Sequence, residues 1–143
     1  MKHQYFTADV FTRTPFHGAQ IAVFPNAEGL SDEQMQAIAQ ELNLSETVFL
    51  FPINGNNDHF RQRIFNTRGE VDFAGHTILA TAHILAETGA VPLAEKNTQI
   101  MFELPQQTIE ANVSQKDGKP SFVQFHMQCS PIVDRFTPSE SEL

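Results

Sequence analysis

Residues 75–87 have the sequence Gly75-His76-Thr77-Ile78-Leu79-Ala80-Thr81-Ala82-His83-Ile84-Leu85-Ala86-Glu87. The apolar side chains of this stretch leave no wide polar face, and a soluble helix of that kind is normally buried on most sides. Gly89 ends the predicted helix and Pro92 prevents its resumption. We therefore expect a buried central helix in which Leu79 and Leu85 are almost fully covered.

Strand patterns surround this helix on both sides of the sequence. They are bounded by turn residues, among them Pro15-Phe16-His17-Gly18, Asn54-Gly55-Asn56-Asn57 and Lys116-Asp117-Gly118-Lys119. The predicted strands cover residues 5–11, 19–24, 47–51, 59–65, 98–104, 108–113 and 121–127. One central helix with about seven strands is an α+β arrangement, which we expect to be a sheet curled about the helix.

A second helix is predicted near the N-terminus. Ser31-Asp32-Glu33-Gln34 forms a capping box, with Ser31 as N-cap and Gln34 at the third helical position. Apolar residues then recur at helical spacing until the helix ends near Asn43. Gln36 is expected on the polar side of this surface helix, where its replacement by alanine would cost almost nothing.

Length and composition indicate one globular domain with an ordinary core, since the chain has 143 residues of which 41% are hydrophobic. A net charge of −8 with only 9 lysines and arginines argues against nucleic-acid and anionic-membrane partners. No apolar run approaches the roughly 20 residues that span a bilayer, and the N-terminus has no signal-peptide core. We therefore expect a cytoplasmic protein. Cys129 is the single cysteine, so it is expected to be a small core residue and not part of an internal disulfide.

Gly75-His76 starts the central helix and is a candidate anion site. The first N–H groups of a helix lack intrahelical partners and lie at the positive end of its dipole. Glycine allows a carboxylate or phosphate to approach the backbone closely. The alternative is that Gly75 serves a tight chain entry while His76 caps or packs.

Glu46 lies at the start of a strand whose next residues are apolar. Val48, Phe49, Leu50 and Phe51 indicate a dry neighbourhood, in which a carboxyl group becomes suited to acid–base work. The alternative is a solvated acidic residue, since these are common at the starts of strands.

Other chemistry is poorly supported. His76, His83 and Glu87 share one helix face, which leaves a zinc site as a weak alternative without a fourth ligand at suitable spacing. We find no nucleophile elbow, phosphate loop or dinucleotide-binding fingerprint. No metal is therefore expected.

Three ordered segments carry a resemblance to a known family. They are Phe16-His17-Gly18-Ala19-Gln20-Ile21-Ala22-Val23-Phe24, the helix at 30–44 followed by Ser45-Glu46-Thr47-Val48-Phe49, and Arg63-Ile64-Phe65 with Asp72-Phe73-Ala74-Gly75-His76. They resemble motifs of the phenazine-biosynthesis PhzF-like family, which is related to diaminopimelate epimerase. The resemblance implies two similar domains, each a β-barrel wound around one central buried helix, with the active site in the cleft between them. This chain resembles the N-terminal domain alone, over residues 1–136, and residues 137–143 would start the connection to a second domain.

The resemblance also implies roles for individual residues. Glu46 occupies the position of the family's catalytic glutamate, which shuttles a proton during isomerisation without a cofactor. His76 matches the histidine that contacts the substrate. Gly75 falls where epimerases of the superfamily place a cysteine, which argues against a two-cysteine racemase.

Several positions depart from the family pattern. The family usually has Gly-Asn-Pro where this chain has Gly18-Ala19-Gln20, proline where it has Thr77, and Thr-Pro where it has Asn66-Thr67. These changes concern the substrate more than the fold. The resemblance further implies that residues of a second domain complete the family's site, and we expect the 143 residues to lack them.

We therefore expect a cofactor-independent isomerase that moves a proton between carbons of a small carboxylated substrate, incomplete without a second domain. The alternative is a catalytically inactive half-domain that folds and self-associates as a homodimer or larger homo-oligomer. Whether the coding sequence continues past Leu143 would distinguish a fragment from a natural short protein.

Overall fold

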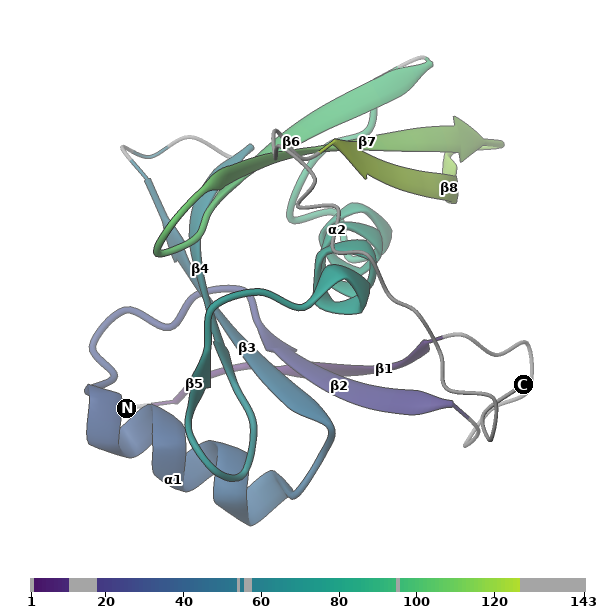
Figure 1. The fold of residues 1–143 in the computed structure, drawn as a ribbon. Coiled ribbons are helices and arrows are strands. Elements are labelled where there is room, and N and C mark those ends of the chain that lie inside the picture. The colour runs from purple at the N-terminus through teal and green to yellow at the C-terminus, as the bar shows by residue number, and fades with distance from the viewer. Residues whose placement is uncertain (1, 11–17, 54, 56–57, 95, 127–143) are drawn as a thin grey trace, which may run out of the picture.

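The computed structural model describes residues 2–10, 18–53, 55, 58–94 and 96–126. These residues form eight strands and two helices (Figure 1). In chain order they are β1 (Phe6–Val10), β2 (Ala19–Phe24), α1 (Asp32–Leu42), β3 (Glu46–Pro52), β4 (His59–Phe65), β5 (Glu70–Val71), α2 (Gly75–Glu87), β6 (Asn97–Glu103), β7 (Thr108–Lys116) and β8 (Lys119–His126). The expectations for Cys129, for residues 137–143 and for most of the turns at 15–18 and 54–57 lie outside the described residues.

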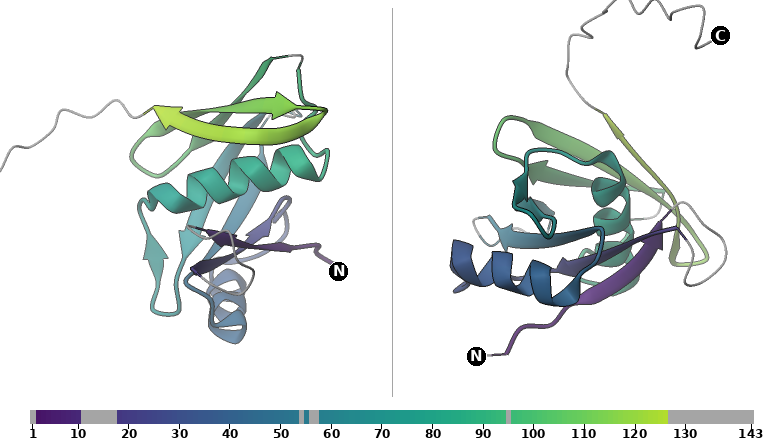
Figure 2. Two further views of the ribbon diagram at one scale, coloured as in Figure 1. Left: turned by 90° about the vertical axis from the view of Figure 1, so that its right-hand side faces the viewer. Right: turned by 60° about the horizontal axis from the view of Figure 1, so that its bottom comes forward.

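The eight strands form one curled sheet. Seven follow the order β1-β2-β3-β4-β6-β7-β8, and β5 pairs with β4. Pairing is antiparallel except between β2 and β3 and between β4 and β6. Figures 1 and 2 show β6, β7 and β8 on one side of α2, with β1, β2 and β3 on the other.

The expected α+β class and curled sheet are confirmed, but the closed barrel is not. Within the described residues β1 and β8 are the two ends of the sheet and do not pair with each other. α2 contacts both of these strands, so it lies across the gap between them. The sheet is therefore a curled half-barrel.

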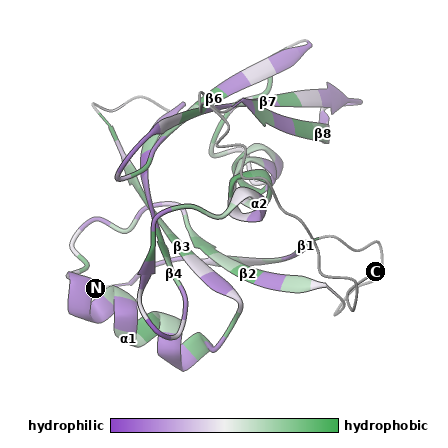
Figure 3. Ribbon diagram, viewed as in Figure 1, coloured by the Kyte–Doolittle hydropathy of each residue, from purple (hydrophilic) through white to green (hydrophobic). Residues whose placement is uncertain are grey.

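Helix α2 supplies much of the core. The side chains of Ile78, Ala82 and Leu85 have no exposed area. They pack with apolar residues of the curled sheet, such as Val48 of β3 and Ile109 of β7. Figure 3 shows hydrophobic residues along much of α2, whereas α1 alternates between hydrophilic and hydrophobic bands.

One stripe of α2 remains accessible, which corrects the expectation for Leu79. Leu79, His83 and Glu87 follow one another at intervals of four residues, so they share a helix face. His83 and Glu87 are exposed and Leu79 is half-buried. Near-complete burial is thus confirmed for Leu85 and wrong for Leu79, because no described element covers this face.

Helix α1 packs on the outer face of the sheet. Its capping box is confirmed, because the Ser31 hydroxyl accepts from the Gln34 backbone and the Gln34 side chain accepts from the Ser31 backbone. Met35 and Ala39 are buried beside Phe49 of β3. The structure differs from the expected surface position of Gln36, and the small cost of Gln36→Ala stays a prediction.

Gln36 is not a simple surface residue. It is half-buried, and its Nε2 donates to the carbonyl of Asn66 at 3.0 Å.

The turn at 116–119 is confirmed, since Asp117 and Gly118 have φ values of 56° and 79° between β7 and β8. Two consecutive positive φ angles match the twist of a tight hairpin.

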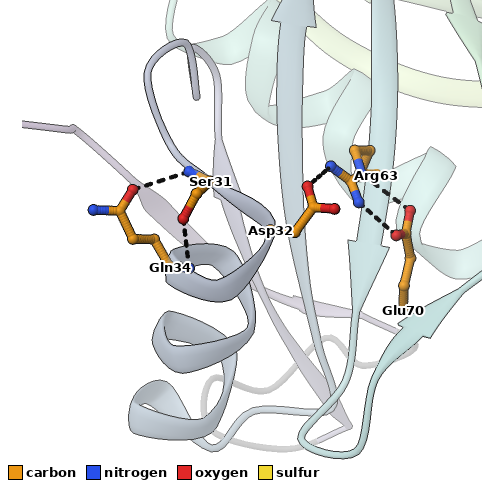
Figure 4. A network of polar contacts seen from close by, with 5 residues as sticks. All are labelled: Ser31, Asp32, Gln34, Arg63 and Glu70. Carbon is orange, nitrogen blue, oxygen red and sulfur yellow. Dashed lines mark hydrogen bonds and ion pairs between the residues drawn. The ribbon is translucent and has the colours of Figure 1, made fainter.

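Arg63 of β4 links α1 to the sheet (Figure 4). Its Nη1 contacts Asp32 Oδ1 at 2.6 Å, and its Nε and Nη2 donate to the two carboxylate oxygens of Glu70 at 3.0 and 2.7 Å. The side-chain hydrogen bonds that Arg63 donates to Glu70 and Asp32 raise the pKa of Arg63. The hydrogen bond from Arg63 lowers the pKa of Asp32 below 3.8. This arginine is therefore engaged in structure and does not form a basic patch.

We expect Asp32→Asn to lower the free energy of unfolding at neutral pH and to lose that effect in acid. Because the native pKa of Asp32 lies below 3.8, the unfolded chain binds more protons as the pH falls. The stabilisation is therefore complete above 3.8 and disappears as the pH falls through the native pKa. Denaturant unfolding of the wild type and of Asp32→Asn over a pH series measures the difference in their free energies of unfolding. Glu33→Gln, at the exposed neighbouring acid, is the control, and a difference for Asp32→Asn that persists in strong acid would contradict the prediction.

Candidate functional site

Glu46 is the first residue of β3 and lies on the face of the sheet that meets α2. Its neighbours two and four positions along, Val48 and Leu50, belong to the core around α2. Its backbone pairs with Ile21 of β2, which is also fully buried. The side chain of Glu46 is 17% exposed, so the carboxylate lies at the margin of an apolar core.

His76 is the second residue of α2. The preceding Ala74 is the N-cap, with extended backbone and no side-chain cap. The His76 Nε2 lies 2.7 Å from Oε2 of Glu46, and the imidazole side chain is 24% exposed. The structure therefore brings together two side chains that are 30 residues apart in the sequence.

This contact holds one proton between the two groups. A carboxylate has only acceptor atoms, so a hydrogen must lie on Nε2 when Glu46 is ionised. If Glu46 is protonated, its hydroxyl donates to Nε2 in the opposite direction. Partial burial strengthens such a bond, since water competes less for both partners. A contact of this kind, in which either group can carry the shared hydrogen, is compatible with acid–base chemistry.

Gly75 precedes His76 in a confined space between two aromatic rings. A Cβ placed on Gly75 would lie 3.3 Å from Cζ of Phe125 and 3.6 Å from Cζ of Phe73. The two rings are 6.3 Å apart in an edge-to-face arrangement. The absence of a side chain at Gly75 therefore lets the two rings lie close to the start of α2.

We expect Gly75→Ala to lower the free energy of unfolding by about 1 kcal/mol, because the new methyl group forces the Phe125 ring to shift. The cost should shrink in a Phe125→Leu background, and a double-mutant cycle from denaturant unfolding measures that coupling. Gly69→Ala is the matched control, since a Cβ there meets no atom within 4 Å. Equal costs at the two glycines would contradict the prediction.

Two further residues of the site were not identified as such from the sequence. Gln62 of β4 is fully buried, and its Nε2 lies 3.4 Å from Oγ1 of Thr77, the residue after His76. The signal was present in the sequence, because Gln62 falls between the core residues Phe60 and Ile64 on the apolar face of its strand.

Two surface depressions among the described residues lie away from Glu46 and His76, although Gln62 lines one of them. One, of about 350 Å³, is lined by residues of β4, β5 and the end of β6, including Arg61 and Glu103. Another of the same volume lies near the N-terminus, beside His3 and Pro25. The Glu46–His76 pair is at neither of them.

The residues of the alternative zinc site contact different partners in the structure. His83 contacts Glu87 at 2.9 Å, whereas His76 contacts Glu46. In the part of the chain that the structure describes, no three His, Cys, Asp or Glu side chains are grouped so that they could hold a metal ion. Among the same residues, no helix is long and apolar enough to cross a membrane.

Comparison with known proteins agrees with the motifs. A family model described as phenazine biosynthesis-like protein, PhzC-PhzF, matches residues 8–143. An uncharacterized isomerase of Pasteurella multocida is 36% identical over 135 residues, which cover 85% of this chain and 46% of that protein. Trans-2,3-dihydro-3-hydroxyanthranilate isomerase of Pseudomonas aeruginosa is 36% identical over 118 residues, covering 82% of this chain and 40% of that enzyme. The chain thus spans about half the length of the curated relatives it matches, or less.

Solved structures show the same relation. A predicted epimerase from Pseudomonas aeruginosa matches with a TM-score of 0.72 and 30% identity, over 81% of this chain and 40% of that one. A PhzF-family phenazine biosynthesis protein of Bacillus anthracis has a TM-score of 0.72 and 27% identity, and the match covers 87% of this chain and 40% of that one. A probable proline racemase from Agrobacterium radiobacter has a TM-score of 0.59 and 17% identity, and the match covers 77% of this chain and 38% of that one. This similarity concerns the fold alone. These neighbours agree with the expected diaminopimelate-epimerase-like class.

Proposed function

Because this chain belongs to the phenazine biosynthesis-like PhzF family, we propose that it carries the proton-transfer residue of a cofactor-independent isomerase. The proposed substrate is a small carboxylated molecule. The observation that carries the proposal is the 2.7 Å contact between Glu46 and His76 at the N-terminus of α2. Relatives that are named isomerases support the reaction class.

In the proposed reaction, Glu46 moves one proton between two carbons of the substrate. The carboxylate takes a proton from the first carbon, and the electron pair of the broken C–H bond passes into the substrate's own conjugated system. Glu46 is then a neutral acid, which returns the proton to the second carbon. The enzyme ends in its starting state, so no oxidant or reductant is needed. A base placed in this way contributes about 10²- to 10⁴-fold to the rate.

His76 supports both states of Glu46. It binds Oε2 of the carboxylate, whereas Oε1 makes no hydrogen bond to another described residue. That oxygen is the one we assign to the substrate proton. Further hydrogen bonds to an anion are proposed to come from the backbone at the start of α2, because the N-terminus of a helix favours negative charge.

The substrate carboxylate is proposed to bind at these N–H groups. The rings of Phe73 and Phe125 beside Gly75 suit a flat, unsaturated molecule. The departures at Ala19, Gln20 and Thr77 support a substrate that differs from that of typical family members.

A facing surface is proposed to complete the site, because the chain corresponds to 38–47% of several relatives. A second copy of this chain is one candidate for that surface. The accessible stripe of α2 and Phe122 of β8, which is 60% exposed, support self-association. A catalytically inactive half-domain that self-associates is the second candidate function.

We expect the isolated chain to be a dimer or larger at micromolar concentration. The accessible stripe of α2 and the exposed Phe122 of β8 favour a symmetric pair over a monomer. Sedimentation equilibrium measures the mass directly. A soluble species of 16.1 kDa would contradict self-association.

Proton exchange with solvent tests the proposed function. Small unsaturated carboxylates, including trans-2,3-dihydro-3-hydroxyanthranilate, would be incubated in D₂O and analysed for deuterium on carbon. The assay compares the 143-residue chain with the same chain extended by any coding sequence that follows Leu143. We expect exchange by the extended protein and none by the chain alone. Failure of the extended protein with every compound would contradict the isomerase, and turnover by the isolated chain would contradict the need for a facing surface.

A further inference from the structure

We propose that Gln62 is a positioning residue for the Glu46–His76 pair and acts through the hydroxyl of Thr77. The inference rests on the proposed function for the importance of the pair. The contacts that carry it belong to the fold and can be tested without turnover.

Gln62 occupies a position where an apolar side chain would be expected. It lies on the inner face of β4 between Phe60 and Ile64, which both belong to the core around α2. Its side chain has no exposed area. A buried amide is destabilising unless it is hydrogen-bonded, so its presence here calls for a specific partner.

That partner is Thr77, and the direction of the bonds is determined. The Thr77 hydroxyl donates its single hydrogen to the carbonyl of Ala74, with an Oγ1–O distance of 2.6 Å. Its oxygen can therefore only accept from Gln62 Nε2, which lies 3.4 Å away. The Thr77 backbone N–H also donates to the Ala74 carbonyl, at 3.0 Å. A chain of hydrogen bonds thus runs from β4 to the N-cap of α2.

The first turn of α2 needs such an anchor. Its N-cap, Ala74, provides no side-chain cap, whereas α1 begins with a complete capping box. His76 lies between Ala74 and Thr77, so the conformation of this turn decides where the imidazole points. β3 carries Glu46 and pairs directly with β4, which carries Gln62. Adjacent strands therefore hold both the carboxylate and the anchor of the histidine that meets it.

The remaining atoms provide a matched control. Gln62 Oε1 has no partner among the described residues, and the same holds for Oγ1 of the fully buried Thr81. Thr81 lies one turn after Thr77 in α2. Thr81→Val therefore removes a buried hydroxyl from the same helix but leaves the hydrogen bonds that join Gln62, Thr77 and Ala74.

The test measures the ¹⁵N chemical shift of His76 Nε2 in the 143-residue chain, with Glu46→Gln as the reference for a lost pair. Thr77→Val and Gln62→Leu should move this resonance toward its position in Glu46→Gln. Thr77→Ser, which keeps the hydroxyl, and Thr81→Val should leave it at the wild-type position. In Gln62→Leu the Thr77 amide should also exchange with solvent about fivefold faster.

Circular dichroism and denaturant unfolding first establish which variants are folded. A folded Thr77→Val with the wild-type resonance would overturn the proposal, as would an equal displacement in Thr81→Val. If Gln62→Leu does not fold, the comparison of Thr77→Val with Thr81→Val decides alone. A protein that exchanges no substrate proton but shows the expected resonances would contradict the proposed function, whereas the proposed role of Gln62 would stand.

Discussion

Glu46→Gln is expected to reduce proton exchange into substrate by about 10²- to 10⁴-fold in a form of the protein that is active. The amide keeps the size of the side chain, but it cannot take a proton from carbon. The melting temperature should change by only a few degrees, because Glu46 lies at the margin of the core and is 17% exposed. Deuterium incorporation from D₂O and a thermal melt of the same sample measure the two effects.

Glu103→Gln is the matched control for this prediction. Glu103 forms a second glutamate–histidine pair, with a distance of 3.0 Å to His59, on β6 and β4. That pair is not at the start of a helix and should not affect exchange. Retention of exchange by Glu46→Gln with an identified substrate would exclude Glu46 as the base. An equal loss in Glu103→Gln would point to general destabilisation.

Leu85→Ala is expected to lower the free energy of unfolding by about 2–5 kcal/mol. The side chain has no exposed area and belongs to the core between α2 and the curled sheet. Its truncation removes apolar contacts and leaves a cavity that a densely packed interior fills only in part. Denaturant unfolding of the isolated chain gives the value, provided that protein concentration is held constant for a self-associating species.

Leu79→Ala and Glu41→Ala calibrate this measurement. Leu79 lies on the accessible stripe of the same helix, so its truncation should cost clearly less than that of Leu85. Glu41 is exposed on α1, and its replacement should stay within about 0.5 kcal/mol of the wild type. If Leu85→Ala were as mild as Glu41→Ala, α2 would not be a core helix.

The elements with a strong local signal could be predicted from the sequence. The bounds of α2, β2 and β4 agree with the predicted ranges, and the capping box at Ser31 marks the start of α1. β5 was missed because two residues are too few to produce a pattern. The ends of several other strands differ by one to three residues, since fraying ends depend on pairing and not on composition.

Errors in burial have a different cause. Leu79 and Leu85 are both leucines of one apolar helix, yet only Leu85 is fully covered. Gln36 has the polarity of a surface residue but donates to the Asn66 carbonyl after the β4 strand. Periodicity states which residues share a helix face, whereas the arrangement of the sheet decides which face is covered.

The sequence by itself determined the family motifs, the two helices and the identity of Glu46, Gly75 and His76 as candidate site residues. These properties depend on residue type and on spacing within one segment. Only the tertiary structure decided that Glu46 and His76 meet at 2.7 Å and that Gln62 lies 3.4 Å from Thr77 in the first turn of α2. Such contacts join residues 15 and 30 positions apart. They depend on the register of β3 with β4 and on the curl that brings both strands against the start of α2, and no local pattern in the chain encodes that geometry.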